Sequence, residues 1–241
     1  MFLAKKENRV NPVGTSNEAN RQVWLKRVLA EIPAGARLLD AGAGEQKFKA
    51  LCAHLEYVAQ DFGEYDGMGD NTGLQTGSWD QTKLDIVSDI TAIPQPDASF
   101  DAVICIEVLE HLPEPLAALE EFSRLLKAGG QLLVTAPFCS LTHFAPYHFY
   151  TGFSRYFYGA HLPSLGFEIV EMQENGNFFE YLAQELRRLP EIADRYAKDA
   201  PSQAEDAALR QILEMLERFS VKDAKSAELL HFGYHVKAIR R

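Results

Sequence analysis

The sequence predicts a doubly wound α/β fold, in which helices cover both faces of a largely parallel sheet. Short runs rich in Leu, Ile and Val alternate along the chain with segments of helical periodicity, and several runs are continuously apolar, as buried parallel strands are. The chain has 241 residues, of which 46% are hydrophobic and 24% charged, a balance typical of a globular protein. We therefore expect a core that folds without disulfides or a structural metal.

Seven short runs of apolar residues predict the strands of this sheet. In chain order they lie at residues 37–40, 56–60, 85–89, 100–106, 131–136, 167–172 and 231–239. The first run ends in a glycine-rich turn, and the last alternates apolar with polar positions. Between the second and third runs, residues 62–83 hold five glycines and show no periodicity, which predicts a long mobile loop.

Helical spacing of apolar residues predicts the segments that cover the sheet. In chain order these are residues 16–32, 48–55, 116–126 and 153–162, followed by two amphipathic helices within residues 174–229. The sequences Thr15-x-x-Glu18 and Ser202-x-x-Glu205 match capping boxes at the start of the first and last helices. The sequence Lys-Ala-Gly-Gly at 127–130 is expected to end the third.

These elements predict a single domain over residues 1–241. We expect an N-terminal helical cap (1–36), a ligand-binding core (37–173), a helical insertion (174–229) and a last strand (230–241). The apolar faces of the insertion suit packing on the sheet, a wall of a substrate pocket or a homodimer contact. The sequence leaves these three open.

Charge and cysteine content exclude several classes of function. The 24 Lys and Arg residues against 34 Asp and Glu give a net charge of -10, and no basic stripe offers a track for phosphates, so we expect no nucleic-acid partner and no stable membrane insertion. Cys52, Cys105 and Cys139 are odd in number and widely spaced, which fits reduced thiols and no zinc ribbon. With no apolar secretory segment at its start, the protein is expected to be cytoplasmic.

Acidic residues end the first three predicted strands, and the first of them adjoins a glycine turn. Asp40 precedes Gly42 and Gly44, where a ligand can approach the backbone, while Asp61 and Asp89 follow the next two strands. Lys47 stands where the dinucleotide fingerprint has its third glycine, which disfavours NAD and FAD. An ammonium, a ribose diol and an adenine amino group would each find an acid at these places. S-adenosylmethionine is such a phosphate-free ligand.

The motifs of this sequence, in their order along the chain, resemble those of the class I S-adenosylmethionine-dependent methyltransferases of the type 11 group, which includes ubiquinone and menaquinone methyltransferases. The resemblance covers residues 37–172 and rests on residues 40–44, 61, 99–103, 107–112 and 126–130. It implies a Rossmann-like sheet of seven strands, mostly parallel with the last antiparallel. It departs from many members at Glu45 and Gln46, where these carry a further glycine.

The resemblance also implies roles for individual residues. Asp40, Gly42 and Gly44 form the first cofactor motif, and Asp61 holds the ribose hydroxyls. Asp89, with the backbone at Ile90, contacts the adenine, and Glu107 lies near the methionine end. The product would be S-adenosylhomocysteine. The stretch from Pro137 to Phe167, which includes His143 and His148, is similar to methyltransferases associated with cell-surface glycan pathways.

Methyl transfer from a sulfonium needs an aligned acceptor and, for a hydroxyl, a proton acceptor. His148 and then His143 are the candidates, because both follow the fifth strand and an imidazole titrates near neutral pH. The aromatic residues around them suit either a lid over the ligands or core packing. Trp79 of the glycine-rich loop suits a contact with the cofactor. We thus expect methyl transfer to a small-molecule, lipid-linked or glycan-linked acceptor, with oxygen favoured.

Three alternatives are weighed against this hypothesis. An NAD-dependent oxidoreductase is disfavoured by the acids and by Lys47. A cofactor-binding or partner-binding module without turnover is compatible with the same motifs. Glu107, Glu110 and His111 resemble the trio that helps magnesium-dependent O-methyltransferases bind metal, with His143 or His148 as a further ligand, but metal-free relatives share Glu-His-Leu here and we expect no metal.

Overall fold

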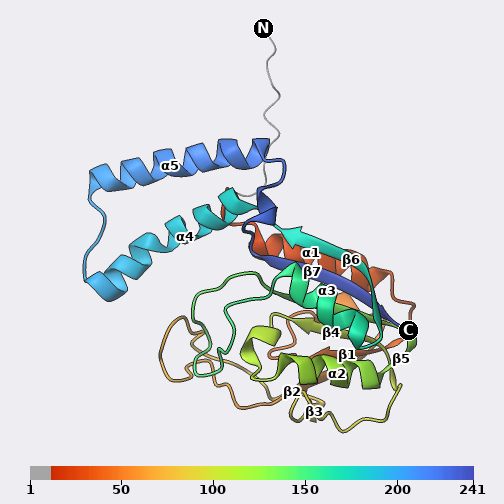
Figure 1. Ribbon diagram of the computed structural model, residues 1–241. Coiled ribbons are helices and arrows are strands. Elements are labelled where there is room, and N and C mark those ends of the chain that lie inside the picture. Colours follow the sequence, from red (N-terminus) through yellow and green to blue (C-terminus); the bar gives the residue numbers. More distant parts are fainter. Residues whose placement is uncertain (1–11) are drawn as a thin grey trace. The chain divides into compact units, whose positions relative to one another are not determined.

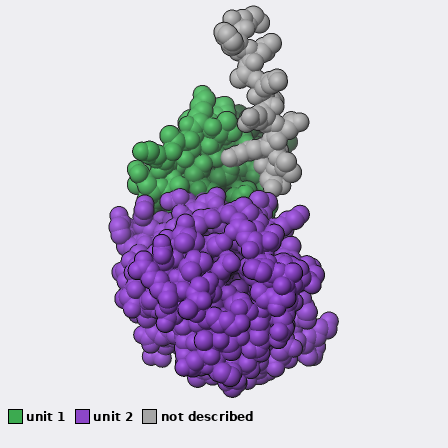
Figure 2. All heavy atoms as spheres, turned by 90° about the vertical axis from the view of Figure 1, so that its right-hand side faces the viewer, with its two compact units in different colours: residues 1–20, 176–232 green, residues 21–175, 233–241 purple. Residues whose placement is uncertain are grey.

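A computed structural model describes residues 12–241 and divides them into two units, which Figure 2 distinguishes by colour. Unit 2, which holds residues 21–175 and 233–241, contains the whole sheet. Unit 1 comprises the described residues up to 20 together with residues 176–232. No helix in the described part of the chain is long and apolar enough to cross a membrane.

The sheet of unit 2 has seven strands in the order β3-β2-β1-β4-β5-β7-β6 (Figure 1). The strands are β1 (Arg37–Ala41), β2 (Glu56–Asp61), β3 (Ile86–Val87), β4 (Phe100–Ile106), β5 (Leu126–Pro137), β6 (Phe167–Asn175) and β7 (Gly233–Arg240). The first five pair in parallel, and β7 runs antiparallel between β5 and β6. The predicted mostly parallel sheet with an antiparallel last strand is confirmed. The strand order reverses between β1 and β4, where α/β sheets bind ligands.

Helices cover both faces of this sheet. On one face, α1 (Asn17–Ala30) buries Trp24, Leu25, Val28 and Leu29 against β1 and β4, together with the 3₁₀ helix η1 (Lys49–Cys52). On the other face, α2 (Pro115–Leu125) and α3 (Arg155–Ser164) pack Phe122, Leu119, Tyr158 and Leu162 onto the same strands and β5. These are the apolar positions whose spacing predicts the helices, so the core follows the sequence pattern.

Three elements differ from the prediction. Of the helix expected at 48–55, only the short η1 forms. The turn before it extends through Gln46, which has a φ of 59°, and β2 already begins at Glu56, so few residues are left for a helix. The third strand shrinks to Ile86–Val87, since the sheet edge gives it one neighbour. β5 begins at Leu126, directly after α2, because Leu126 pairs with Phe100 before the register shifts.

Unit 1 is built from two long helices (Figure 1). These are α4 (Phe178–Ile192), which a short π-helix (η3, Ala193–Ala197) extends, and α5 (Gln203–Lys222), which is followed by η4 (Ser226–Glu228). The predicted capping box at Ser202 and Glu205 is present at the start of α5. Val13, Ala183 and Leu216 form a small core between these elements, and the buried Glu180 accepts hydrogen bonds from the Gly14 N–H and the Ser16 hydroxyl.

Candidate functional site

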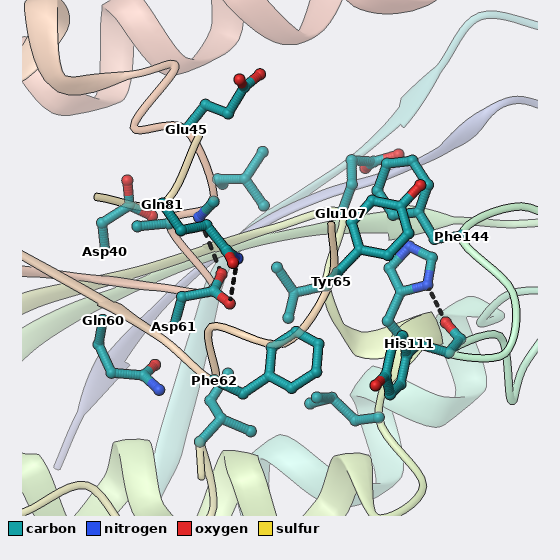
Figure 3. A pocket seen from close by; sticks show the side chains of 18 of the residues that line it. Asp40, Glu45, Gln60, Asp61, Phe62, Tyr65, Gln81, Glu107, His111 and Phe144 are labelled. Atoms are coloured by element: carbon teal, nitrogen blue, oxygen red, sulfur yellow. Dashed lines mark hydrogen bonds between the residues drawn. The ribbon is translucent and has the colours of Figure 1, made fainter. Parts of the chain in front are cut away.

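A cavity of about 780 Å³ lies at the carboxyl ends of β1, β2 and β4 in unit 2. This volume is typical of sites for small ligands and cofactors. Figure 3 shows its two sides: the carboxylates and amides of Asp40, Gln60, Asp61 and Gln81 on one, and the rings of Tyr65, Phe144 and His111 on the other. All seven residues predicted to bind the cofactor line this cavity, namely Asp40, Gly42, Gly44, Asp61, Asp89, Ile90 and Glu107.

Asp40, the last but one residue of β1, is a buried carboxylate with a shifted titration. Its side chain is 2% exposed, and the Tyr57 hydroxyl donates a hydrogen bond to it. Burial raises the pKa of Asp40 to about 7, the Tyr57 hydrogen bond opposes this rise, and the nearby charge of Asp61 adds to it. A cation bound beside Asp40 would favour its ionised form.

The glycine turn after β1 lies against the cavity because its glycines lack side chains. Gly42 has a φ of +79°, and a Cβ there would lie 2.5 Å from a methyl group of Val108. Gly44 has a φ of +49°, and its Cβ would lie 2.5 Å from the Trp79 ring. Gln46 takes a left-handed conformation without being glycine, at the place where many methyltransferases carry one. The turn predicted from the sequence is therefore present, with Gln46 as its third left-handed residue.

Asp61 connects the glycine turn to the long loop. Its Oδ2 accepts a hydrogen bond of 2.9 Å from the Gly44 N–H, and its Oδ1 accepts bonds of 3.1 Å from Gly63 and from the Gln81 amide. Asp89 is exposed and caps the following turn through the backbone N–H and hydroxyl of Thr91. Both acids lie at strand ends, as the sequence predicts.

Glu107 closes the end of β4 in a left-handed conformation, with a φ of 56°. Its Oε1 accepts a hydrogen bond of 2.7 Å from the Thr135 hydroxyl, and its Oε2 lies 3.5 Å from a guanidinium nitrogen of Arg21. Arg21 also lines the cavity. No sequence motif indicates Arg21, because it lies on α1 before the first motif.

Aromatic residues from two loops form the other side of the cavity. Tyr65 stacks on Phe144 at 4.8 Å, and the Trp79 ring meets both edge-on at 5.5 Å. Backbone hydrogen bonds join the loops, including Leu74 N–H to Thr142 and Asp70 N–H to Ala145. Some of the aromatic residues after β5 line the cavity, as a lid over the ligands would, and others pack in the core. Phe144, Tyr147 and Phe149 line the cavity, whereas Tyr150 packs on Phe153 below α3.

Three histidines gather beside the aromatic side. Ligating nitrogens of His111, His143 and His148 lie within 4.8 Å of one another, and His111 also lines the cavity. Burial and then the charge of His143 lower the pKa of His111 to about 3, and the same two causes lower the pKa of His148. His143 and His148, the predicted catalytic residues, are not among the described residues that line the cavity. They lie behind His111.

The Glu107, Glu110 and His111 trio is divided in the structure. Glu107 is engaged with Thr135 and Arg21, whereas Glu110 is fully buried and lies beside His111 and His143. Burial, reinforced by the charge of Glu107, raises the pKa of Glu110 well above its usual range. The 3₁₀ helix η2 (Leu109–His111) begins only after Glu107. Glu107 is therefore not in the same helical turn as Glu110 and His111.

Comparisons with known proteins agree with the fold and the motifs. Residues 39–134 match the family model described as a methyltransferase domain. The chain is 36% identical over 117 residues to the ubiquinone biosynthesis O-methyltransferase of Xanthomonas axonopodis, a match that covers 47% of this chain and only about half (48%) of that enzyme. It is 34% identical over 194 residues to the demethylmenaquinone methyltransferase of Renibacterium salmoninarum, covering 78% of this chain and 75% of that one.

Solved structures share the fold at lower identity. A SAM-dependent methyltransferase from Archaeoglobus fulgidus has a TM-score of 0.56 at 20% identity and covers 92% of this chain and 94% of its own. Phosphoethanolamine N-methyltransferase 2 of Haemonchus contortus, solved with S-adenosylmethionine, has a TM-score of 0.51 at 18% identity and covers 97% and 54%. With the cavity, the glycine turn and these relatives, the chain belongs to the class I S-adenosylmethionine-dependent methyltransferases.

Proposed function

We propose that this methyltransferase transfers the methyl group of S-adenosylmethionine to an oxygen of a small-molecule, lipid-linked or glycan-linked acceptor by in-line displacement. The observation that carries the proposal is the charge of the cavity. Six carboxylates line it against two basic side chains; they are Asp40, Glu45, Asp61, Glu64, Asp89 and Glu107 against Arg21 and Lys47. Such a cavity repels diphosphates and favours a ligand with cationic groups.

The residues of the cavity fit S-adenosylmethionine. Asp40 is a buried carboxylate whose ionised form a cation stabilises, which suits the ammonium of the methionine part. The missing side chains at Gly42 and Gly44 leave room for close approach. Asp61 would accept from the ribose hydroxyls, and Asp89 with Ile90 would contact the adenine. When bound, S-adenosylmethionine supplies a methyl group on a sulfonium.

Glu107 and Arg21 would act at the methionine end of the ligand. The hydrogen bond from Thr135 and the contact with Arg21 fix the Glu107 carboxylate at the cavity wall. Arg21 places a guanidinium beside it, which suits the carboxylate of the methionine part because guanidinium groups bind carboxylates in a fork geometry. These contacts would orient the sulfonium toward the aromatic side.

The aromatic side would hold the acceptor. Tyr65, Phe144 and Trp79 offer ring faces to an apolar or cyclic part and exclude water from it. His148 and His143, which adjoin the cavity-lining His111 and do not line the cavity themselves, are the proposed proton acceptors for a hydroxyl, and the lowered pKa of His148 keeps its imidazole neutral at pH 7. The name of the Xanthomonas relative, an O-methyltransferase, supports oxygen as the attacking atom.

Calorimetric titration tests the cofactor before the chemistry. The protein should bind S-adenosylmethionine and S-adenosylhomocysteine but not NAD. Asp61→Ala and the isosteric Asp61→Asn should weaken both adenosyl ligands about 10- to 100-fold, as expected for loss of charged hydrogen bonds. Asp70→Ala removes an exposed aspartate of the same loop and should bind normally. Binding of NAD, or failure to bind either adenosyl ligand, would refute the proposal.

Turnover separates an enzyme from a binding module. Mixtures of candidate hydroxylated acceptors with labelled methyl donor should give labelled product and S-adenosylhomocysteine. Tight donor binding without any transfer to cellular extracts, together with stable association with another protein, would favour the module. The structure gives no specific support to that second function, so we do not propose it.

A further inference from the structure

The side chains of His111, His143 and His148 lie close enough together to share one ligand. The ring centroids of His111 and His143 lie 4.6 Å apart, and those of His143 and His148 lie 4.8 Å apart. One ligating nitrogen from each ring lies within 4.8 Å of the other two. In a tetrahedral site with metal–nitrogen bonds of about 2.0 Å, ligand atoms lie about 3.3 Å apart. Small side-chain movements would bring the three rings to that spacing.

Backbone carbonyls orient two of the rings. Nδ1 of His111 hydrogen-bonds the carbonyl of Tyr147, and Nδ1 of His143 hydrogen-bonds the carbonyl of Leu141 at 2.8 Å. A carbonyl oxygen can only accept, so each Nδ1 carries a proton, and Nε2 is the nitrogen of each ring that can ligate a metal. This is the arrangement that fixes metal-ligating histidines in proteins. Among the described residues, neither ring nitrogen of His148 has a hydrogen-bond partner.

A buried carboxylate faces the same point. Oε1 of Glu110 lies 3.7 Å from Nε2 of His111 and 3.8 Å from Nε2 of His143. Glu110 is fully buried, and neither of its side-chain oxygens has a hydrogen-bond partner within residues 12–241. A buried carboxylate without donors costs several kcal/mol unless a cation or a proton neutralises it. Beside these three imidazoles, a metal cation would do so.

We propose that His111, His143, His148 and Glu110 form a binding site for a divalent transition metal of the zinc class. Three imidazole nitrogens with one carboxylate oxygen are donors that Zn²⁺, Co²⁺ and Ni²⁺ prefer, whereas Mg²⁺ prefers oxygen ligands and retained water. Glu107 is outside this set because Thr135 and Arg21 hold its carboxylate. The site therefore shares Glu110 and His111 with the magnesium trio considered from the sequence, but it leaves out Glu107, uses both His143 and His148, and favours a different metal.

Folding assembles the site from two segments. Glu110 and His111 belong to η2 after β4, and His143 and His148 lie on the loop after β5. The backbone carbonyl of Glu110 accepts hydrogen bonds of 2.9 and 3.1 Å from the N–H groups of Phe149 and Tyr150, which fixes the loop beside η2. Because His111 also lines the cavity, the metal would border the acceptor side. A metal lowers the pKa of a bound oxygen, so it would take over the task assigned to a histidine base; this last step rests on the proposed function, whereas metal binding does not.

Cobalt titration of the protein without a histidine tag tests the site. After chelation, wild type should bind one equivalent of Co²⁺ with a visible absorption band, Zn²⁺ should displace it, and Mg²⁺ should not. We expect a Kd below about 1 μM, as tight protein sites have. His148→Gln and Glu110→Gln should weaken binding more than about 100-fold, because changes outside the ligands alone cost 10- to 100-fold. His161→Gln, an imidazole on α3 away from the cluster, should bind as wild type does.

The outcomes separate the metal site from the rest of the protein. No Co²⁺ or Zn²⁺ binding by wild type, displacement by Mg²⁺, or unchanged binding by His148→Gln would overturn the proposal. S-adenosylhomocysteine binding and the melting temperature show whether each variant is folded. If a variant is not folded, proton NMR of the Co²⁺-loaded wild type is the deciding measurement. Three shifted imidazole N–H signals would support the site, and the absence of such signals would refute it. The titration contains no methyl donor, so a failed cofactor titration leaves this result standing.

Discussion

Asp40→Asn should stabilise the protein at high pH while weakening its cofactor binding. Asp40 is the fully buried carboxylate of the glycine-turn motif, and the Tyr57 hydroxyl donates a hydrogen bond to it. An asparagine keeps the size of the side chain and an oxygen that can accept from Tyr57. It removes only the ability to ionise, so the comparison isolates the buried charge.

The size of the effect follows from the pKa of Asp40. Burial raises this pKa from 3.8 to about 7 in the folded protein, whereas the unfolded chain keeps the ordinary value. Each pKa unit corresponds to about 1.36 kcal/mol, so ionised Asp40 lowers the free energy of unfolding by up to about 4 kcal/mol. Between pH 3.8 and 7 the folded state binds more protons than the unfolded state, and stability falls as the pH rises. Below pH 3.8 the charge makes no difference, and above pH 7 the loss is complete.

Urea unfolding at pH 4, 6 and 8 measures this difference. Asp40→Asn should match wild type near pH 4 and exceed it by up to about 4 kcal/mol at pH 8, since only the wild type carries the buried charge there. Asp199→Asn, at an exposed carboxylate, should follow wild type at each pH. Equal stability of wild type and Asp40→Asn at pH 8 would refute the reasoning. In wild type, S-adenosylmethionine should also bind more weakly below pH 7, and this dependence should vanish in Asp40→Asn.

Two further predictions concern the glycine turn and the loop that faces it. Gly44→Ala should lower the melting temperature and weaken S-adenosylhomocysteine binding more than Gly77→Ala does, because both have positive φ but only the Gly44 Cβ would meet the Trp79 ring, at 2.5 Å; equal effects would show that backbone strain of about 1–2 kcal/mol is the whole cause. In a Trp24→Phe background, Trp79 fluorescence should change when S-adenosylmethionine binds, because Trp79 lines the cavity; an unchanged signal would place the ligand elsewhere.

Much of the fold is predictable because its strands are buried on both faces. β4 has the predicted bounds, Phe100–Ile106, since a continuous apolar run between Asp101 and Glu107 fits only a central strand. The connections are less predictable. Apolar positions from Phe48 to Leu55 have helical spacing, yet only η1 forms, because the preceding turn consumes residues that a helix would need. Local spacing carries no information about how many residues a turn uses.

The site divides in the same way. Asp40, Asp61 and Asp89 could be predicted because parallel strands end at one edge of the sheet, and each acid follows such a strand. Arg21, Tyr57 and Gln81 could not, since each reaches the site from an element whose sequence shows only helix, strand or loop. Only the resemblance to magnesium-dependent enzymes suggests that His143 or His148 could lie near His111, because the contact between η2 and the loop after β5 is encoded by no local pattern.

The positions of two buried carboxylates also bear on whether the protein catalyses a reaction or only binds its cofactor. Asp40 and Glu110 are both buried carboxylates whose pKa burial raises, and each lowers stability when ionised. Asp40 lines the cavity on the side of the glycine turn (Figure 3), whereas Glu110 lies beside His111, which belongs to the aromatic side. A module that only held the cofactor would need the first group and gain nothing from the second. Retaining an unneutralised carboxylate beside three imidazoles is expected where a bound cation or an acceptor proton offsets its cost, which is the arrangement of an active site.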